Sequence, residues 1–231
     1  MASARPDLSW HPLFRVGGVA ALAFMLLVLV PVALVFAAPV PPADGQALLV
    51  YIAEHRLVYL VELICFVGLA VPALLVFLAL AVALLPVHRT GALIGGLLGV
   101  VSETIALALG SSPQSLHGGL VLLSSSYAAA GSDAERAGLV SAADALVAAT
   151  NAVSWAGILT AAAIGVLSWV MWRGGFSRAW AVLGIVAGAL GVASEALRPM
   201  IGSGYLLYGM LLPIWSGWVG WKLLRLGATH G

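Results

Sequence analysis

Long apolar runs separated by short polar breaks dominate the sequence. The runs long enough to cross a membrane lie near residues 14–38, 57–85, 91–110, 151–172, 179–197 and 205–224. A spanning helix needs about 20 predominantly apolar residues. The composition agrees, because 62% of residues are hydrophobic and 8% charged, with a mean hydropathy of +1.10, whereas a soluble domain carries about 25% charged residues. We predict an all-α integral membrane protein with a single transmembrane domain, residues 1–231, built as a bundle of about six helices.

Residues 111–150, between the third and fourth runs, are less apolar. The first part, "SLHGGLVLLSSSYAAAG", is short for a span, so we expect a re-entrant or interfacial helix at residues 114–130; a seventh span is the alternative. The second part, "SDAERAGLVSAADALVAATNA", opens with Ser132, Asp133 and Glu135. A serine N-cap and acidic residues in the first turn favour a helix start. We predict an amphipathic helix that runs into the fourth span.

Basic residues set the expected orientation, because cytoplasmic loops of membrane proteins are enriched in lysine and arginine. With six spans, one side receives Arg5, Arg15, Arg89, Arg173, Arg178, Lys222 and Arg225, and the other receives Arg56, Arg136 and Arg198. This bias predicts both termini in the cytoplasm and residues 111–150 outside. Tryptophans near the cytoplasmic span ends fit interface anchors: Trp10, Trp172, Trp180, Trp218 and Trp221.

Two readings compete with parts of this topology. A seven-span arrangement divides the basic residues evenly between the two sides. The first run could also be a secretory signal, because "VFAAP" at residues 35–39 resembles a cleavage site. The apolar run before that point is longer than the core of a typical signal peptide, and we therefore treat it as a retained span.

A short glycine-rich stretch occurs twice, as "GLLGVVSE" at residues 96–103 and "GALGVASE" at residues 188–195, with six of eight positions identical. Glycines at intervals of three or four residues precede the glutamate in each copy: Gly91, Gly95 and Gly99, then Gly184, Gly188 and Gly191. Such spacing places them on one helix face, where small residues let helices approach closely in lipid. We predict packing faces. The match suggests a parallel duplicated hairpin, and chance in a chain rich in glycine and alanine is the alternative.

Three carboxylates are the strongest candidates for chemistry: Glu62, Glu103 and Glu195, all expected in the outer half of the membrane. Ionisable groups inside a bilayer are costly and are functional-site hypotheses by default. They could converge on one ligand pocket or supply a catalytic acid. The expected surroundings of the pocket are Tyr59, His117, Asn151, Trp155 and Arg198.

Structural roles are the alternatives for these carboxylates. Arg198 follows Glu195 by three residues, a spacing that permits an ion pair. For Glu62 and Glu103 the alternative is a hydrogen bond to a serine, threonine or tyrosine on a neighbouring helix.

Several classes of function find no support. The net charge of +1 gives no electrostatic case for nucleic acid. Cys65 is the one cysteine, so neither an internal disulfide nor a cysteine metal framework can form. The histidines and glutamates lack the Glu-x-x-His spacing of di-iron bundles. No phosphate-binding loop, nucleophile elbow or dinucleotide fingerprint occurs. We expect no metal and no cofactor.

Segments at both ends and in the second half resemble a known family. "FRVGGVAAL", "SDAERAGLVSAADALVAATNA", "RGGFSRAWAVLGIVAGALGV" and "IWSGWVGWKLLRLG" occur in this order. They are similar to the bacterial membrane family catalogued as domain of unknown function 4386. The resemblance implies a small multi-pass bacterial membrane protein, and it implies no activity or catalytic residues.

The function we favour from sequence is binding or sensing of a small lipophilic or cationic ligand by an intramembrane, carboxylate-bearing pocket. Membrane lipid, a small hydrophobic ligand and a second copy of the chain are the expected partners. An enzyme that uses a glutamate as general acid on a lipid or isoprenoid is the main alternative. A small transporter and an assembly subunit are further alternatives.

Overall fold

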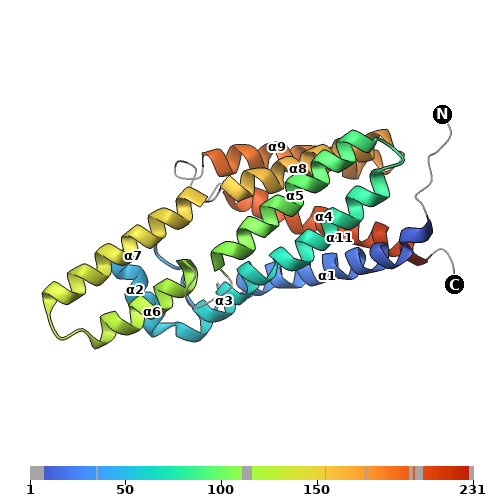
Figure 1. Ribbon diagram of the computed structural model, residues 1–231. Helices are drawn as coiled ribbons and strands as arrows, with labels where there is room; N and C mark the ends of the chain where they lie inside the picture. Colours follow the sequence, from blue (N-terminus) through green and yellow to red (C-terminus); the bar gives the residue numbers. More distant parts are fainter. Residues whose placement is uncertain are drawn as a thin grey trace. The chain divides into compact units, whose positions relative to one another are not determined.

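The computed structural model describes residues 8–34, 36–110, 116–153, 155–174, 176–197, 200 and 205–228 (Figure 1). Every regular element among them is a helix. In chain order these are η1 (Leu8–Trp10), α1 (His11–Leu34), α2 (Gly45–Glu54), α3 (Arg56–Gly68), α4 (Ala70–Leu84), α5 (Arg89–Gly110), α6 (Leu116–Ala129), α7 (Asp133–Val153), α8 (Trp155–Arg173), α9 (Arg178–Ala196) and α11 (Tyr205–Ala228).

Five helical segments are long and apolar enough to cross a membrane. They are His11–Pro31, Arg56–Leu84, Arg89–Ala108, Ala156–Arg173 and Arg178–Ala196. The prediction of an all-helical, multi-pass membrane protein is confirmed at this level. The sixth predicted span, residues 205–224, lies in α11, a helix of 24 residues whose apolar run is interrupted by Pro213, Ser216 and Lys222. The count of six spans stays a prediction.

The second predicted span, residues 57–85, consists of two consecutive helices rather than one. Helix α3 ends at Gly68 and α4 begins at Ala70, with Leu69 between them. Pro72 lies in the first turn of α4 and has no N–H to donate to the carbonyl four residues earlier, which belongs to Gly68. The break therefore falls where a helical hydrogen bond is chemically impossible.

Packing divides the chain into two compact units. Unit 1 comprises residues 1–26, 69–105 and 155–231, and unit 2 comprises residues 27–68 and 106–154. The charges are unevenly shared: six of the nine acidic residues but two of the ten basic residues belong to unit 2.

Unit 1 contains the antiparallel helices α4, α5, α8, α9 and α11 together with most of α1 (Figure 1). Helix α8 has the most deeply buried side chains, among them Ile164, Leu167 and Met171. Helices α1 and α11 lie side by side, and Arg15 Nε donates to the Gly227 carbonyl at 2.7 Å. Large apolar side chains are exposed along the outer face of α1, including Val19 at 60% and Leu26 at 65%, as a lipid-facing surface requires.

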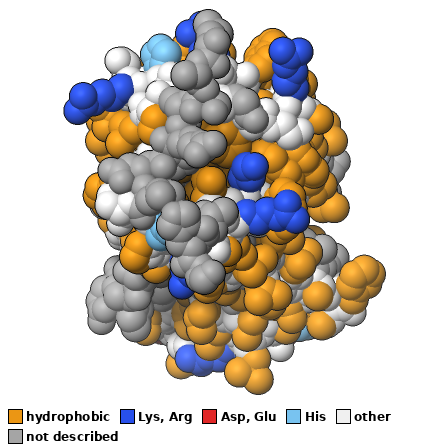
Figure 2. All heavy atoms as spheres, turned by 90° about the vertical axis from the view of Figure 1, so that its right-hand side faces the viewer, with side chains coloured by type: hydrophobic (Ala, Val, Ile, Leu, Met, Phe, Trp, Pro, Cys, Tyr) orange, Lys and Arg blue, Asp and Glu red, His pale blue; other side chains and the backbone are white. Residues whose placement is uncertain are grey.

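The end of unit 1 where α8 and α11 finish combines aromatic and basic side chains. Arginine guanidinium groups lie over indole rings, with centroid distances of 4.1 Å for Arg173 over Trp169 and 3.9 Å for Arg225 over Trp221. Trp180 and Trp218 stack at 5.4 Å. Figure 2 views this end of the molecule and shows basic but no acidic side chains among the described residues. Aromatic rings with lysine and arginine are typical of a membrane interface.

Unit 2 has its own small core, and its helix α2 was missed by the sequence analysis. Asp44 caps α2 by accepting from Ala47 N at 2.8 Å. The α2 side chains Leu48, Leu49 and Ile52 pack with Tyr59 of α3, and the same core includes Leu120 of α6 and Ala143 of α7. Ser124 of α6 donates to the Leu49 carbonyl at 2.7 Å, and Gly45 N donates to Asp144 of α7 at 2.9 Å.

Residues 111–150, expected to hold an interfacial and an amphipathic helix, supply α6 and α7. Helix α6 has 14 residues, fewer than the candidate spans. Helix α7 begins as predicted: Glu135 N donates to Ser132 Oγ at 3.2 Å, and Gly131 N donates to the Glu135 carboxylate at 3.0 Å. This reciprocal pair is a capping box.

Candidate functional site

The first glycine stripe packs α5 against two neighbours within unit 1. A Cβ added to Gly91 would lie 2.7 Å from Val170, and one added to Gly95 would lie 2.6 Å from Leu167, both on α8. On the adjoining face, a Cβ at Gly99 would overlap the Phe77 ring of α4. These positions have no room for a side chain, so the predicted packing role of this stripe is confirmed.

The second glycine stripe packs α9 closely against its neighbours α8 and α11. A Cβ at Gly188 would lie 2.7 Å from the backbone of Gly165 in α8, and one at Gly191 would lie 2.5 Å from the Tyr208 ring of α11. Gly99 thus packs α5 on α4 and Gly188 packs α9 on α8, in each case the preceding helix of the hairpin, whereas Gly91 and Gly95 pack α5 on α8. A duplicated origin, which would account for this likeness, stays a prediction.

Glu103 ends the first stripe and is 4% exposed. Thr160 Oγ1 of α8 donates to Glu103 Oε1 at 3.1 Å. Ser102 Oγ lies 2.5 Å from Thr160 Oγ1 and 2.5 Å from the Ala156 carbonyl, also on α8. Glu103 therefore accepts a hydrogen bond from a hydroxyl on a neighbouring helix, as the structural alternative predicted.

Glu195 ends the second stripe and is 7% exposed. It faces Gly157 of α8, where an added Cβ would lie 2.5 Å from Glu195 Cδ. The absence of a side chain at residue 157 makes the space that this carboxyl group occupies. The ion-pair alternative involves Arg198, which lies outside the described residues.

The carboxyl groups of Glu103 and Glu195 therefore both contact helix α8. Their contacts on α8, Gly157 and Thr160, are three residues apart, and residues at this spacing lie on one helix face. Both glutamates are buried within unit 1, among helices long and apolar enough to cross a membrane. The candidate functional site consists of Glu103, Glu195, Ser102, Thr160 and Gly157.

The other residues predicted for the pocket fall elsewhere. Glu62 and Tyr59 lie on α3 in unit 2, where Tyr59 belongs to the buried core. The side chains of His117, Asn151 and Trp155 lie outside what the structure describes, as does Arg198. Of the three candidate glutamates, the structure brings two to the same helix.

The sequence analysis missed the residues that contact the carboxyl groups of Glu103 and Glu195. Thr160 is a polar residue in an apolar span, and Ser102 directly precedes Glu103 in the repeated "SE" pair. Their hydroxyls were a usable signal, because a polar side chain in a spanning helix commonly bonds across to a neighbour. Gly157 carried no signal, since its importance depends on the side chain opposite.

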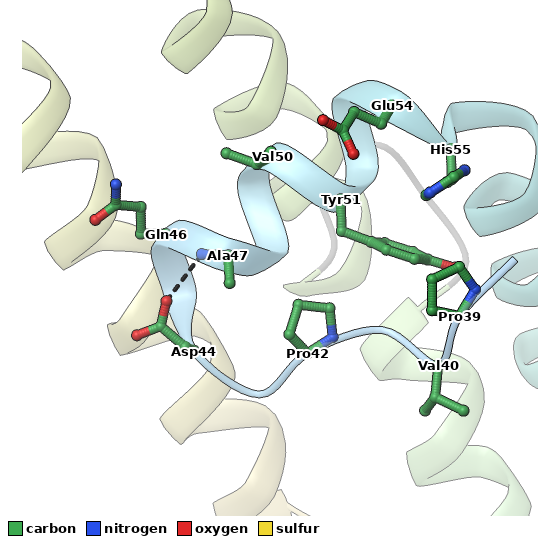
Figure 3. A pocket seen from close by; sticks show the side chains of 10 residues that line it. All are labelled: Pro39, Val40, Pro42, Asp44, Gln46, Ala47, Val50, Tyr51, Glu54 and His55. Carbon is green, nitrogen blue, oxygen red and sulfur yellow. Dashed lines mark hydrogen bonds between the residues drawn. The ribbon is translucent and has the colours of Figure 1, made fainter.

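The structure also contains two hollows that these glutamates do not line, one of them in unit 2. A groove of about 530 Å³ runs between α2 and the preceding segment and is lined by Pro39, Val40, Pro42, Asp44, Gln46, Ala47, Val50, Tyr51, Glu54 and His55 (Figure 3). A second hollow of about 440 Å³, between α1 and α4, is apolar apart from Arg15. No three histidine, cysteine, aspartate or glutamate side chains are grouped for a metal ion within the described part of the chain.

Comparison of the chain with family models, with curated proteins and with solved structures finds no match. The functional argument therefore depends on the geometry of the chain itself.

Proposed function

We propose that the chain is a six-span protein of a bacterial inner membrane, related to the family named above, with both termini in the cytoplasm. We propose further that it binds a small lipophilic or cationic ligand inside the bilayer through Glu103 and Glu195. Five apolar helices support the membrane location. The pairing of α11 with α1 supports α11 as the sixth span, because an even number of spans returns the chain to the side where it started.

The observation that carries the binding proposal is the burial of two carboxyl groups against the same face of α8. An ionised carboxylate in an apolar environment is costly unless a positive charge or hydrogen bonds compensate it. A cation placed beside α8 would provide that compensation for Glu103, and it would lie against the helix face that Glu195 also contacts. The small residues around them, above all Gly157, leave helix backbone close to the carboxyl groups.

Uncharged hydroxyls surround the Glu103 carboxyl group. Thr160 Oγ1 donates to Glu103 Oε1, and Ser102 Oγ contacts both Thr160 Oγ1 and the Ala156 carbonyl. None of these contacts supplies a positive charge. A cationic ligand beside an ionised Glu103 would supply it.

Native mass spectrometry of the gently solubilised protein tests the proposal. We expect a discrete extra mass on the wild type that is absent from Glu103→Gln/Glu195→Gln. The matched control is Asp133→Asn/Glu135→Gln, which changes two exposed carboxylates of α7 and should keep the extra mass. Retention of the mass by the buried pair variant would refute binding at these groups, and the same spectra report whether a homodimer forms.

An intramembrane enzyme is the second candidate, because Glu103 is a buried carboxyl group among apolar candidate spans. A protonated Glu103 would transfer its proton to a lipid or isoprenoid alkene, which forms a new C–H bond, a carbocation and the Glu103 carboxylate. Loss of a proton from the carbocation would form the product alkene and return the proton to the carboxylate. Lipid extracts from cells producing the wild type or Glu103→Gln would then differ by a product. Identical lipid profiles would exclude this candidate.

A further inference from the structure

The groove beside α2 is lined by a tyrosine whose buried hydroxyl has no hydrogen-bond partner in the described part of the chain. Tyr51 is 6% exposed, and its hydroxyl oxygen has no hydrogen-bond partner among the described residues. Buried polar groups are nearly always hydrogen-bonded, so such a group requires an explanation. Tyr51 lines the groove, and Figure 3 shows its ring extending from α2 toward Pro39.

Acidic side chains give this groove its charge. Asp44 stands at the start of α2 and Glu54 at its end, and both line the hollow. Arg56, the nearest basic residue along the chain, donates to Ser125 of α6 at 3.4 Å and does not line the groove. Unit 2 as a whole carries six acidic and two basic residues. A surface of this sign concentrates cations.

The remaining lining is apolar and aromatic. Pro39, Val40, Pro42 and Val50 form its apolar wall. The rings of Tyr51 and His55 lie 4.9 Å apart, which places a second aromatic face at the same end (Figure 3). Aromatic faces attract organic cations. With an apolar wall, a carboxylate and a phenol, the groove can hold an ammonium group and the hydrocarbon attached to it.

The protonation state of Tyr51 suits such a ligand. Burial raises the pKa of Tyr51 above its usual range, and the negative charge of Glu62 raises it further. The phenol therefore stays neutral at physiological pH, and its oxygen remains available to accept a hydrogen bond from an ammonium N–H.

We propose that this groove is a second binding site, outside the candidate spans, for an organic ammonium ion with an apolar body. Glu54 and Asp44 supply the negative charge, and the Tyr51 hydroxyl accepts from the ammonium group. This site is independent of the carboxyl groups of Glu103 and Glu195, so the failure of either proposal leaves the other standing.

The test uses the full chain in lipid nanodiscs, with empty nanodiscs as the blank. Two probes share one phenylethyl body: 2-phenylethylammonium carries the charge and 2-phenylethanol does not. We expect calorimetric titration to show the ammonium probe binding the wild type at least about tenfold more tightly than the alcohol, since a charge-assisted contact is worth more than a neutral one. Equal affinity for the two probes would overturn the proposal.

Two substitutions locate the site. Tyr51→Phe removes a hydroxyl that has no partner in the described protein, so the fold should keep its stability while the affinity for the ammonium probe falls about threefold to tenfold. Glu54→Gln should lower the affinity for the ammonium probe by about fivefold. This is the effect of losing an exposed ion pair whose free energy lies at the upper end of the usual range. Glu135→Gln, an exposed glutamate on α7, and Tyr127→Phe, on α6, are the matched controls and should bind as the wild type does.

The outcome also separates this site from the one in unit 1. Unchanged affinity in both Tyr51→Phe and Glu54→Gln, with the melting temperature retained, would overturn the assignment. If the affinity falls instead in Glu103→Gln/Glu195→Gln alone, the probe binds at the buried carboxyl groups and the groove proposal is wrong.

Discussion

At the scale of single residues, the packing of unit 1 depends on glycines, which have no side chain to keep neighbouring helices apart. Gly188 meets the backbone of Gly165, and Gly157 makes space for Glu195. Each absent Cβ allows a helix or a carboxyl group to approach α8. The polar groups also meet on α8, because the buried Glu103 accepts a hydrogen bond from Thr160 and the buried Ser102 contacts the same hydroxyl.

Gly188→Ala should destabilise the protein by about 1–3 kcal/mol, the usual range for overpacking a tight interface. Its methyl group would lie 2.7 Å from backbone atoms of Ala161 and Gly165, which cannot move aside without shifting α8. Thermal unfolding in detergent, followed by size exclusion, measures the effect.

Gly209→Ala on α11 is the matched control for this substitution. An added Cβ there meets nothing within 4 Å, and alanine is favoured over glycine in a helix by up to about 1 kcal/mol. The control should be neutral or slightly stabilising. Equal melting temperatures for the two variants would contradict the packing role of the glycine stripe.

At the scale of elements, helix boundaries follow local chemistry. Helices α2 and α7 begin at side-chain caps, Asp44 for the first and Ser132 for the second. The break between α3 and α4 follows from the missing N–H of Pro72. These boundaries require no distant contact, which explains why the start of α7 was predictable from sequence.

Ser132→Ala should weaken the start of α7 by about 1 kcal/mol, the typical cost of losing an N-cap. Hydrogen exchange of the first-turn amides reports it directly, and we expect faster exchange at Glu135. On the same helix, Ser141→Ala removes a hydroxyl that bonds only one turn back to Ala137 in the described structure and should leave exchange in the first turn unchanged. An unaltered exchange rate in Ser132→Ala would show that the cap is unimportant.

At the scale of the whole molecule, charge and hydrophobicity are partitioned between the two units. The candidate spans fall mainly in unit 1, which carries eight of the ten basic residues, whereas most acidic residues belong to unit 2. Under the proposed topology, the basic residues at the ends of α8 and α11 face the cytoplasm and α7 lies outside. With the N-terminus in the cytoplasm, a seven-span arrangement would reverse this, placing α7 in the cytoplasm and these basic residues outside.

Cysteine labelling distinguishes these arrangements. In a Cys65→Ser background, Ser141→Cys on α7 and Ser177→Cys before α9 introduce matched exposed thiols. A membrane-impermeant maleimide applied to intact spheroplasts should label residue 141 at once and residue 177 only after permeabilisation. The reverse pattern would contradict six spans with both termini in the cytoplasm, and with the N-terminus kept in the cytoplasm it would support seven.

Much of this protein follows from the sequence alone, because its causes are local or compositional. Apolar runs of sufficient length in a chain with 8% charge require membrane helices. The spacing of glycines defines a helix face, and Ser132 with Glu135 defines a helix start. The burial of Glu103 and Glu195 also followed, since their neighbours along the chain are apolar.

Only the tertiary structure decided which groups meet. Glu103 and Glu195 are 92 residues apart, and their approach to one face of α8 depends on which helices the glycine stripes contact. The same limit applies to Glu62 and to the groove around Tyr51. The apolar residues around Glu62 in the sequence did not reveal that it belongs to unit 2. A residue pattern reports which face of a helix is small, polar or apolar, but the partner of that face is chosen by the packing of the whole chain.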